Sequence, residues 1–186
     1  MTVVVKRTTA KATAASRAAS RAATRAEDKR THTSSLGHEA SAVVPQSANQ
    51  FYAMEPIERM GLVQQGVPAN VVNLIADDMQ ISKEKLYATV GVARATIDRK
   101  LRERKLLSPD ESERVLGMAR LVGQVDTMVR ESGRPAQFDA AQWLAAWLDR
   151  PNAALGGKPP AQLMSTVDGR AMVSTVIGQM QAGSYA

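Results

Sequence analysis

The sequence predicts an all-α protein, and three observations lead to that prediction. Apolar residues recur three and four positions apart through most of residues 55–183, which is the spacing of one face of an α-helix. No segment keeps the two-residue alternation of a half-buried strand. Aromatic residues make up only 4% of the 186-residue chain, whereas methionine occurs nine times, a composition that favours the aliphatic cores of packed helices.

Residues 1–52 are expected to form a basic arm that is disordered or frayed in the free protein. They consist mainly of Ala, Ser, Thr, Arg and Lys and offer no apolar face to bury. Residues 1–30 contain eight Lys/Arg and two acids, whereas residues 31–186 contain sixteen of each. The basic excess therefore lies in the arm. Its role stays open between a solubilising tail, a phosphate-binding extension and an organelle transit peptide.

Two helices are expected after the arm. Ile57, Met60, Leu62 and Val63 begin a helical pattern that is interrupted at Gly66–Val67–Pro68. A second helix follows, and its apolar residues are Val71, Val72, Leu74, Ile75 and Met79.

Residues 82–105 have the pattern of a helix-turn-helix. Gly91 lies at the centre, where a sharp turn favours a residue without Cβ. Two apolar pairs, each with a spacing of four, flank this glycine; they are Leu86–Val90 and Ile97–Leu101. We therefore expect a helix-turn-helix domain over residues 53–107, with the helix after Gly91 presenting its polar side to DNA.

The segment 82–105 is also strongly basic, with eight Lys/Arg against three acids. The expected DNA-binding residues are Arg94, Thr96, Asp98, Arg99, Lys100 and Arg102. Arg99 faces away from the apolar stripe, so it is the candidate for a base contact. Two residues fit less well: Ala93 stands where a Ser or Thr cap is preferred, and Asp98 must accept from cytosine or repel phosphate.

Helical signals continue through residues 108–186, which we expect to form a second helical domain. Ser108, Pro109 and Glu111 make a capping box with proline at the first helical position. The helix that follows should end at Gly133 and Pro135. Further helices are expected over residues 138–148 and 161–164, and from about residue 168 to a cap at Gly183.

The sequence offers no set of residues with catalytic spacing, so we expect neither an enzyme nor a metal or cofactor site. Cysteine is absent, which excludes disulfides and zinc ribbons, and no apolar run approaches the length of a membrane span. His32 and His38 lie in the arm without partners, and Pro159 after Gly156–Gly157–Lys158 excludes a phosphate loop. Trp143 and Trp147 fit a core better than a stacking platform.

Four short motifs follow one another in residues 108–186. They are Glu111–Ser112–Arg114, Trp147–Leu148–Pro151–Asn152, Leu155–Gly156–Gly157–Pro160 and Thr166–Gly169. In this order they resemble the E-S-x-R, W-L-x-x-P-N, L-G-G-x-x-P and T-x-x-G motifs of the toxin-binding domain in the Xre/MbcA/ParS antitoxin family. The helix-turn-helix is similar to the Xre-like domain that precedes it in that family, at Leu86, Gly91, Val92, Thr96, Ile97 and Arg99. The resemblance covers roughly residues 56–183.

The resemblance implies an antitoxin that neutralises a RES-domain toxin, a class that consumes NAD or transfers ADP-ribose. In the family, the C-terminal domain binds the toxin and its end lies over the NAD pocket, while the helix-turn-helix represses the operon. The toxin-binding residues are then expected at Trp147, Asn152, Val173, Ile177, Met180, Gly183, Ser184, Tyr185 and Ala186.

The expected partners are this toxin and operator DNA, in the bacterial cytoplasm and away from any membrane. A homodimer or a larger toxin–antitoxin hetero-oligomer is the expected assembly. The alternative is a stand-alone helix-turn-helix regulator whose C-terminal domain dimerises.

Overall fold

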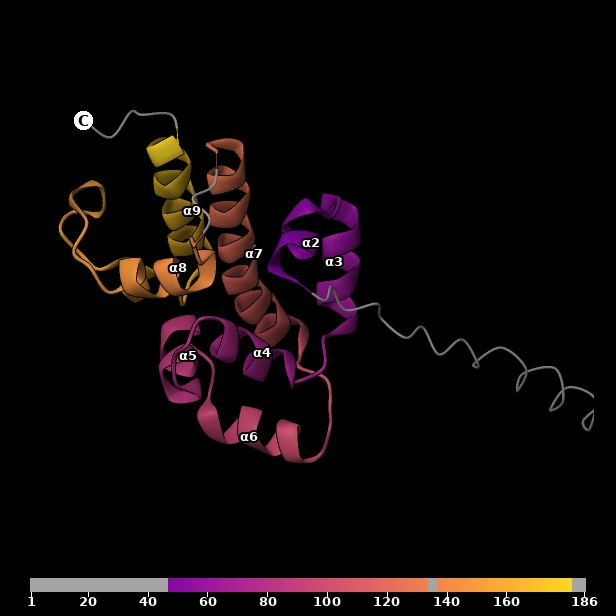
Figure 1. The fold of residues 1–186 in the computed structure, drawn as a ribbon. Helices are drawn as coiled ribbons and strands as arrows, with labels where there is room; N and C mark the ends of the chain where they lie inside the picture. The colour runs from indigo at the N-terminus through magenta and orange to yellow at the C-terminus, as the bar shows by residue number, and fades with distance from the viewer. Residues whose placement is uncertain (1–46, 134–136, 182–186) are drawn as a thin grey trace, which may run out of the picture. The chain divides into compact units, whose positions relative to one another are not determined.

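A computed structural model of the chain describes residues 47–133 and 137–181 (Figure 1). In these two ranges the protein is helical and has no strand, as predicted. The helices before the central helix are α2 (Ala48–Ala53), α3 (Pro56–Gln65), α4 (Val71–Asp78), α5 (Lys83–Val90) and α6 (Arg94–Arg102). Next come α7 (Pro109–Glu131), α8 (Ala140–Leu148), two short 3-10 helices, η1 (Ala153–Leu155) and η2 (Pro160–Leu163), and α9 (Val167–Gln181). Most of the expected arm, residues 1–46, lies outside the described residues.

The end of the expected arm is folded, which corrects the predicted boundary at residue 52. Ser47 caps α2 by accepting from the backbone N–H of Gln50 at 3.3 Å. Phe51 is buried, and α2 lies so close to α7 that a Cβ at Gly123 would be 2.5 Å from the carbonyl oxygen of Ala48. The buried Phe51 anchors this helix together with the close contact at Ala48, and the polar composition around them concealed that signal.

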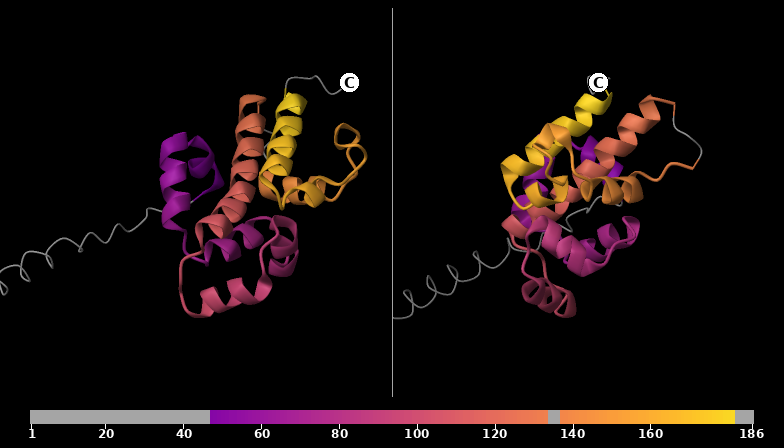
Figure 2. Two further views of the ribbon diagram at one scale, coloured as in Figure 1. Left: turned by 180° about the vertical axis from the view of Figure 1, so that it is seen from behind. Right: turned by 90° about the vertical axis from the view of Figure 1, so that its left-hand side faces the viewer.

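The long helix α7 organises the packing. It contacts α2, α3, α4, α5, α8 and α9, and Figure 2 shows it between the α2–α3 pair and α9. Its predicted capping box is confirmed: Ser108 Oγ accepts from the N–H of Glu111, and the Glu111 carboxylate accepts from the N–H of Ser108. The buried face of α7 consists of Val115, Leu116, Met118, Ala119, Leu121, Val122 and Val125.

The predicted helix-turn-helix is confirmed as α5, a turn and α6. Gly91 ends α5 in the left-handed conformation, at φ 73°, where a residue without Cβ is unstrained. Leu86, Val90 and Ile97 are fully buried between the two helices and their neighbours. A short backbone pairing closes the unit, because the N–H of Leu107 donates to the carbonyl of Val67 at 2.8 Å.

The start of α9 explains the T-x-x-G motif. Thr166 Oγ1 accepts from the backbone N–H of Gly169 at 3.1 Å, which satisfies one of the free N–H groups in the first turn. A Cβ at Gly169 would lie only 1.9 Å from the carbonyl oxygen of Leu163. The turn between η2 and α9 therefore requires glycine at this position.

We predict that Gly169→Ala lowers the free energy of unfolding by about 1–3 kcal/mol, because the new methyl group must displace backbone. Gly178→Ala is the matched control in the same helix, since its Cβ would meet only Gln124 Nε2, at 3.8 Å. This control should be neutral or stabilising, because alanine favours a helix over glycine by up to about 1 kcal/mol. Urea unfolding followed by circular dichroism measures both. Equal stabilities for the two variants would contradict the prediction.

Candidate functional site

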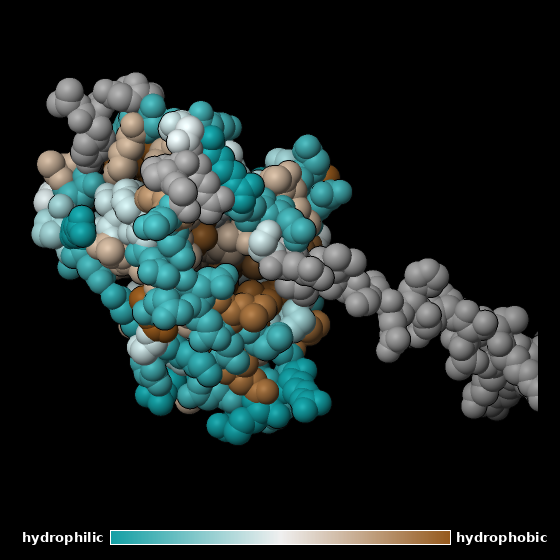
Figure 3. Space-filling view, in the orientation of Figure 1, coloured by the Kyte–Doolittle hydropathy of each residue, from teal (hydrophilic) through white to brown (hydrophobic). Residues whose placement is uncertain are grey.

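The outer face of α6 is the most basic exposed surface of the helix-turn-helix. α6 lies at the lower edge in Figure 1, and Figure 3 shows hydrophilic side chains along that edge. Arg94, Arg99 and Arg102 are exposed, and Thr96 is partly buried. The guanidinium groups of Arg99 and Arg102 make no hydrogen bond or ion pair with another described residue, so both are available to a ligand. Ala93 occupies the N-cap position before Arg94, as expected, and makes no side-chain cap hydrogen bond.

Asp98 is held in place by neighbours that sequence spacing did not identify. Its carboxylate accepts from the Tyr87 hydroxyl at 3.0 Å and from Arg94 at 3.3 Å. Arg94 also pairs with Glu84 at 3.1 Å. Burial and the hydrogen bond to Asp98 raise the pKa of Tyr87 to about 12, so the tyrosine stays a donor near neutral pH. Asp98 therefore holds the side chains of Arg94 and Tyr87 in place, and the positive charge of Arg94 partly balances its negative charge.

Lys100 pairs with a residue outside α6, which corrects its expected role as a DNA contact. Its ammonium group pairs with Glu111 at the first turn of α7, and the two side chains are only 16% and 14% exposed. Burial alone would raise the pKa of Glu111, but hydrogen bonds from Lys100 and Ser108 outweigh it and lower that pKa. Lys100 therefore connects α6 to α7. Its partner lies on the next helix of the chain, where the charge pattern of α6 alone could not reveal it.

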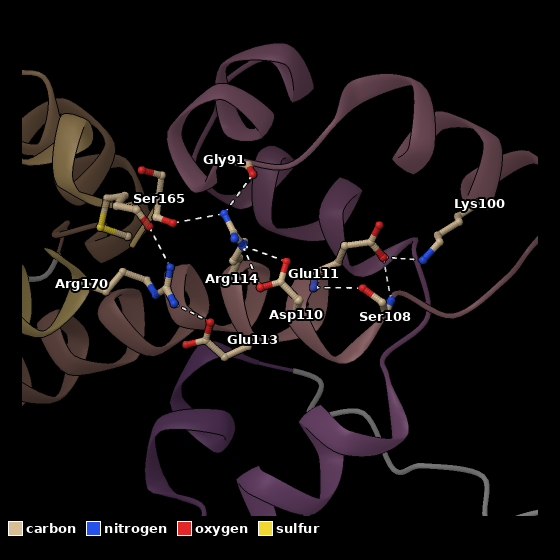
Figure 4. A network of polar contacts seen from close by, with 10 residues as sticks. Gly91, Lys100, Ser108, Asp110, Glu111, Glu113, Arg114, Ser165 and Arg170 are labelled. Carbon is tan, nitrogen blue, oxygen red and sulfur yellow. Dashed lines mark hydrogen bonds and ion pairs between the residues drawn. The ribbon is translucent and has the colours of Figure 1, made fainter. Parts of the chain in front are cut away.

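The remaining residues of the E-S-x-R motif connect α7 to both halves of the fold (Figure 4). The buried Ser112 accepts from the N–H of Val67 at 3.1 Å. Arg114 donates to the carbonyl of Gly91, in the helix-turn-helix turn, and to the carbonyl of Ser165, before α9, each at 3.1 Å. Asp110 pairs with the same guanidinium group at 3.1 Å. The motif therefore connects the helix-turn-helix to the segment that leads into α9.

The residues of the W-L-x-x-P-N and L-G-G-x-x-P motifs shape the turn after α8. Asn152 is buried, and its side-chain oxygen accepts from the N–H of Ala154 at 2.9 Å. Gly156 and Gly157 have positive φ values of 66° and 77°, which bring the chain back so that Asn152 and Lys158 pair through their backbones. Asn152 thus supports the turn from a buried position, whereas the sequence led us to expect a toxin contact.

Trp147 stays accessible in part, beside a second tryptophan. The rings of Trp143 and Trp147 stack with centroids 5.9 Å apart and planes 10° apart, and Phe138 lies 6.2 Å from Trp143. Both tryptophans pack against the core while keeping part of their surface exposed. They form an aromatic edge along α8.

The expected toxin contacts on α9 and in the tail differ in how exposed they are, and some lie outside the described residues. Val173 and Ile177 are fully buried, because the apolar stripe that marks them packs the helix onto the core. This corrects their expected role as contacts. Met180 is partly buried, and the outer face of α9 presents Asp168, Ala171, Met172, Thr175 and Gln179. Gly183, Ser184, Tyr185 and Ala186 lie outside the described residues.

In residues 47–133 and 137–181, no cluster of three His, Cys, Asp or Glu side chains has the geometry to hold a metal ion. None of the helices in that part of the chain combines the length and apolar character required to cross a membrane.

Comparisons with known proteins agree with this arrangement. Residues 58–120 match the antitoxin Xre-like helix-turn-helix domain, and residues 136–183 match the antitoxin Xre/MbcA/ParS C-terminal toxin-binding domain. The chain is also 37% identical, over 142 residues, to a protein named Prs ADP-ribosylating antitoxin from Sphingobium sp. (strain YBL2). That similarity covers 76% of this chain and 89% of the relative.

Both matched families consist of antitoxins rather than enzymes, and the toxin-binding match indicates a toxin as partner. The first match ends within α7 and the second begins after it, so the junction contacts at the start of α7 lie inside the helix-turn-helix match. The chain therefore belongs to the Xre/MbcA/ParS family of antitoxins, with a helix-turn-helix followed by a toxin-binding domain.

Proposed function

We propose that this antitoxin neutralises an ADP-ribosylating toxin of the RES type and represses the operon that encodes both proteins. The observation that carries the proposal is the presence of an exposed arginine face on α6 in the same chain as a toxin-binding domain. Residues 53–107 would bind DNA and residues 108–186 the toxin, with α7 supporting both. The alternative of a stand-alone regulator leaves the toxin-binding match without a role.

The reaction of the toxin is inferred from the relative. Its name describes an antitoxin associated with ADP-ribosylation, a reaction that takes ADP-ribose from NAD. We infer that Gly183–Ala186 covers the NAD pocket of the toxin. Trp147 and Met180 would support this contact beside the tail.

On the DNA side, Arg99 would contact a base edge, and Arg94, Thr96 and Arg102 would line the groove or the phosphates. Asp98 would orient Arg94 and Tyr87. Lys100 is not included among the proposed DNA contacts, because it pairs with Glu111. A homodimer or a toxin–antitoxin hetero-oligomer would present several α6 helices at once and would strengthen modest individual contacts.

We predict that Arg99→Ala weakens binding to the DNA upstream of the gene by about 1–3 kcal/mol, or roughly 5- to 150-fold. Arg99→Lys keeps the charge but loses the planar fork, so it should also weaken binding if the contact is to a base. Arg150→Ala removes an equal charge from an exposed position after α8 and is the matched control. A gel shift at fixed salt measures all three. Unchanged affinity for Arg99→Ala would refute the assignment.

Lys100→Ala should act on stability instead of on DNA contacts. It leaves the partly buried Glu111 without its ammonium partner, at an expected cost of about 1–3 kcal/mol. The pKa of Glu111 is lowered in the folded state, so the pair stabilises the protein above the unfolded pKa of about 4.3. That contribution is lost as the pH falls through the folded-state pKa. The difference in melting temperature between wild type and Lys100→Ala should therefore shrink in acid, and an unchanged difference would argue against the ion pair.

We predict that deleting Gly183–Ala186 abolishes protection from the toxin but leaves operator binding by the antitoxin alone intact. The measurement is growth of cells that express the toxin together with either form of the antitoxin. The melting temperature of the purified variant is the control for folding. Full protection by the truncated chain would show that the tail does not block the toxin.

A further inference from the structure

A groove runs along α7 between α3 and α9. Its volume is about 650 Å³. The floor is formed by the first half of α7, one wall by α3 and the other by the start of α9. Figure 2 shows these helices from behind, with α7 between the other two. The groove therefore joins the helix-turn-helix segment to the toxin-binding segment.

Each wall of the groove has a solvent-exposed apolar side chain. Met60 on α3 is 55% exposed and Val167 on α9 is 65% exposed, and both line the groove. Ile57, one turn before Met60, is 73% exposed. The sequence predicted Ile57 and Met60 as part of a helical apolar pattern, but of the apolar side chains of α3 only Leu62 is buried. One exposed apolar residue on each wall gives the groove apolar surface that a partner could cover.

The groove is also positively charged. Arg59, Arg120 and Arg170 line it together with a single acid, Glu113, which pairs with Arg170. Arg59 donates to the backbone carbonyls of Tyr52 and Met54, so its charge is not neutralised there. Arg120 is exposed, and its guanidinium group forms no hydrogen bond or ion pair with another described residue. A matching partner would combine an apolar surface with a carboxylate near Arg120.

We propose that the groove between α3 and α9 binds an apolar segment of the toxin that carries a carboxylate for Arg120. This inference rests on the proposed toxin neutralisation and extends it. The groove is continuous with the toxin-binding segment, because its α9 wall lies inside residues 136–183. The opposite wall, α3, lies in the helix-turn-helix match. The toxin would then contact both segments of the antitoxin.

The test measures binding of the toxin encoded beside this gene, in a catalytically inactive form, to the full antitoxin by calorimetry. Met60→Glu and Arg120→Glu should each raise the Kd for the toxin by about tenfold or more, as expected for contacts at the centre of an interface. Arg120→Lys, which keeps the charge, should restore most of the affinity. Leu74→Glu is the matched control, since Leu74 is also 55% exposed but lies on α4, outside the groove. It should bind the toxin as wild type does.

The possible outcomes separate the two proposals. If the wild-type chain does not bind the toxin, the proposed function fails. If wild type binds and both groove variants bind equally well, the groove proposal alone fails. If the variants keep toxin affinity but reduce self-association in sedimentation, the groove is a contact between two copies and the proposal is overturned. Unchanged circular dichroism and operator binding in the variants would establish that they remain folded.

Discussion

The guanidinium group of Arg114 fixes how the helix-turn-helix lies against the start of α9. It donates to one backbone carbonyl in each, at Gly91 and at Ser165. The spacing is tight, because a Cβ at Gly91 would lie 2.8 Å from the Cβ of Ser165. Removing the arginine would leave two partly covered carbonyls without this donor. The positions of α5, α6 and α9 therefore depend on the first turns of α7.

Much of the fold could be predicted because its signals are local. The apolar spacing on both sides of Gly91, the Ser108 capping box and the glycine turns depend on residues within a few positions of one another. The contacts that decide the roles of charged residues are not local. Lys100 pairs with Glu111 on the next helix, and Asp98 is held by Tyr87 from the preceding one. Sequence spacing therefore identified the basic helix but not which of its charges are free.

The toxin-binding side was harder to predict for a related reason. Periodicity identifies the side of a helix that folding buries, so it selected Val173 and Ile177, which are part of the core. Met60 fits the same kind of pattern on α3 but is exposed, as is Val167 on α9, so the pattern alone did not show which apolar residues remain at the surface. These two lie far apart in the sequence and line one groove only because α3 and α9 pack on the same helix.

The shared helix also limits how such antitoxins can recombine during evolution. A crossover just before α7 would keep α6 but replace Glu111, Ser112 and Arg114, which bind Lys100, Val67 and Gly91 respectively. A crossover after α7 would instead separate Arg114 from Ser165 and Glu113 from Arg170. A crossover on either side of α7 would therefore remove contacts that stabilise the fold. The helix-turn-helix and the toxin-binding segment would then be inherited together, or would change by substitutions on their exposed faces.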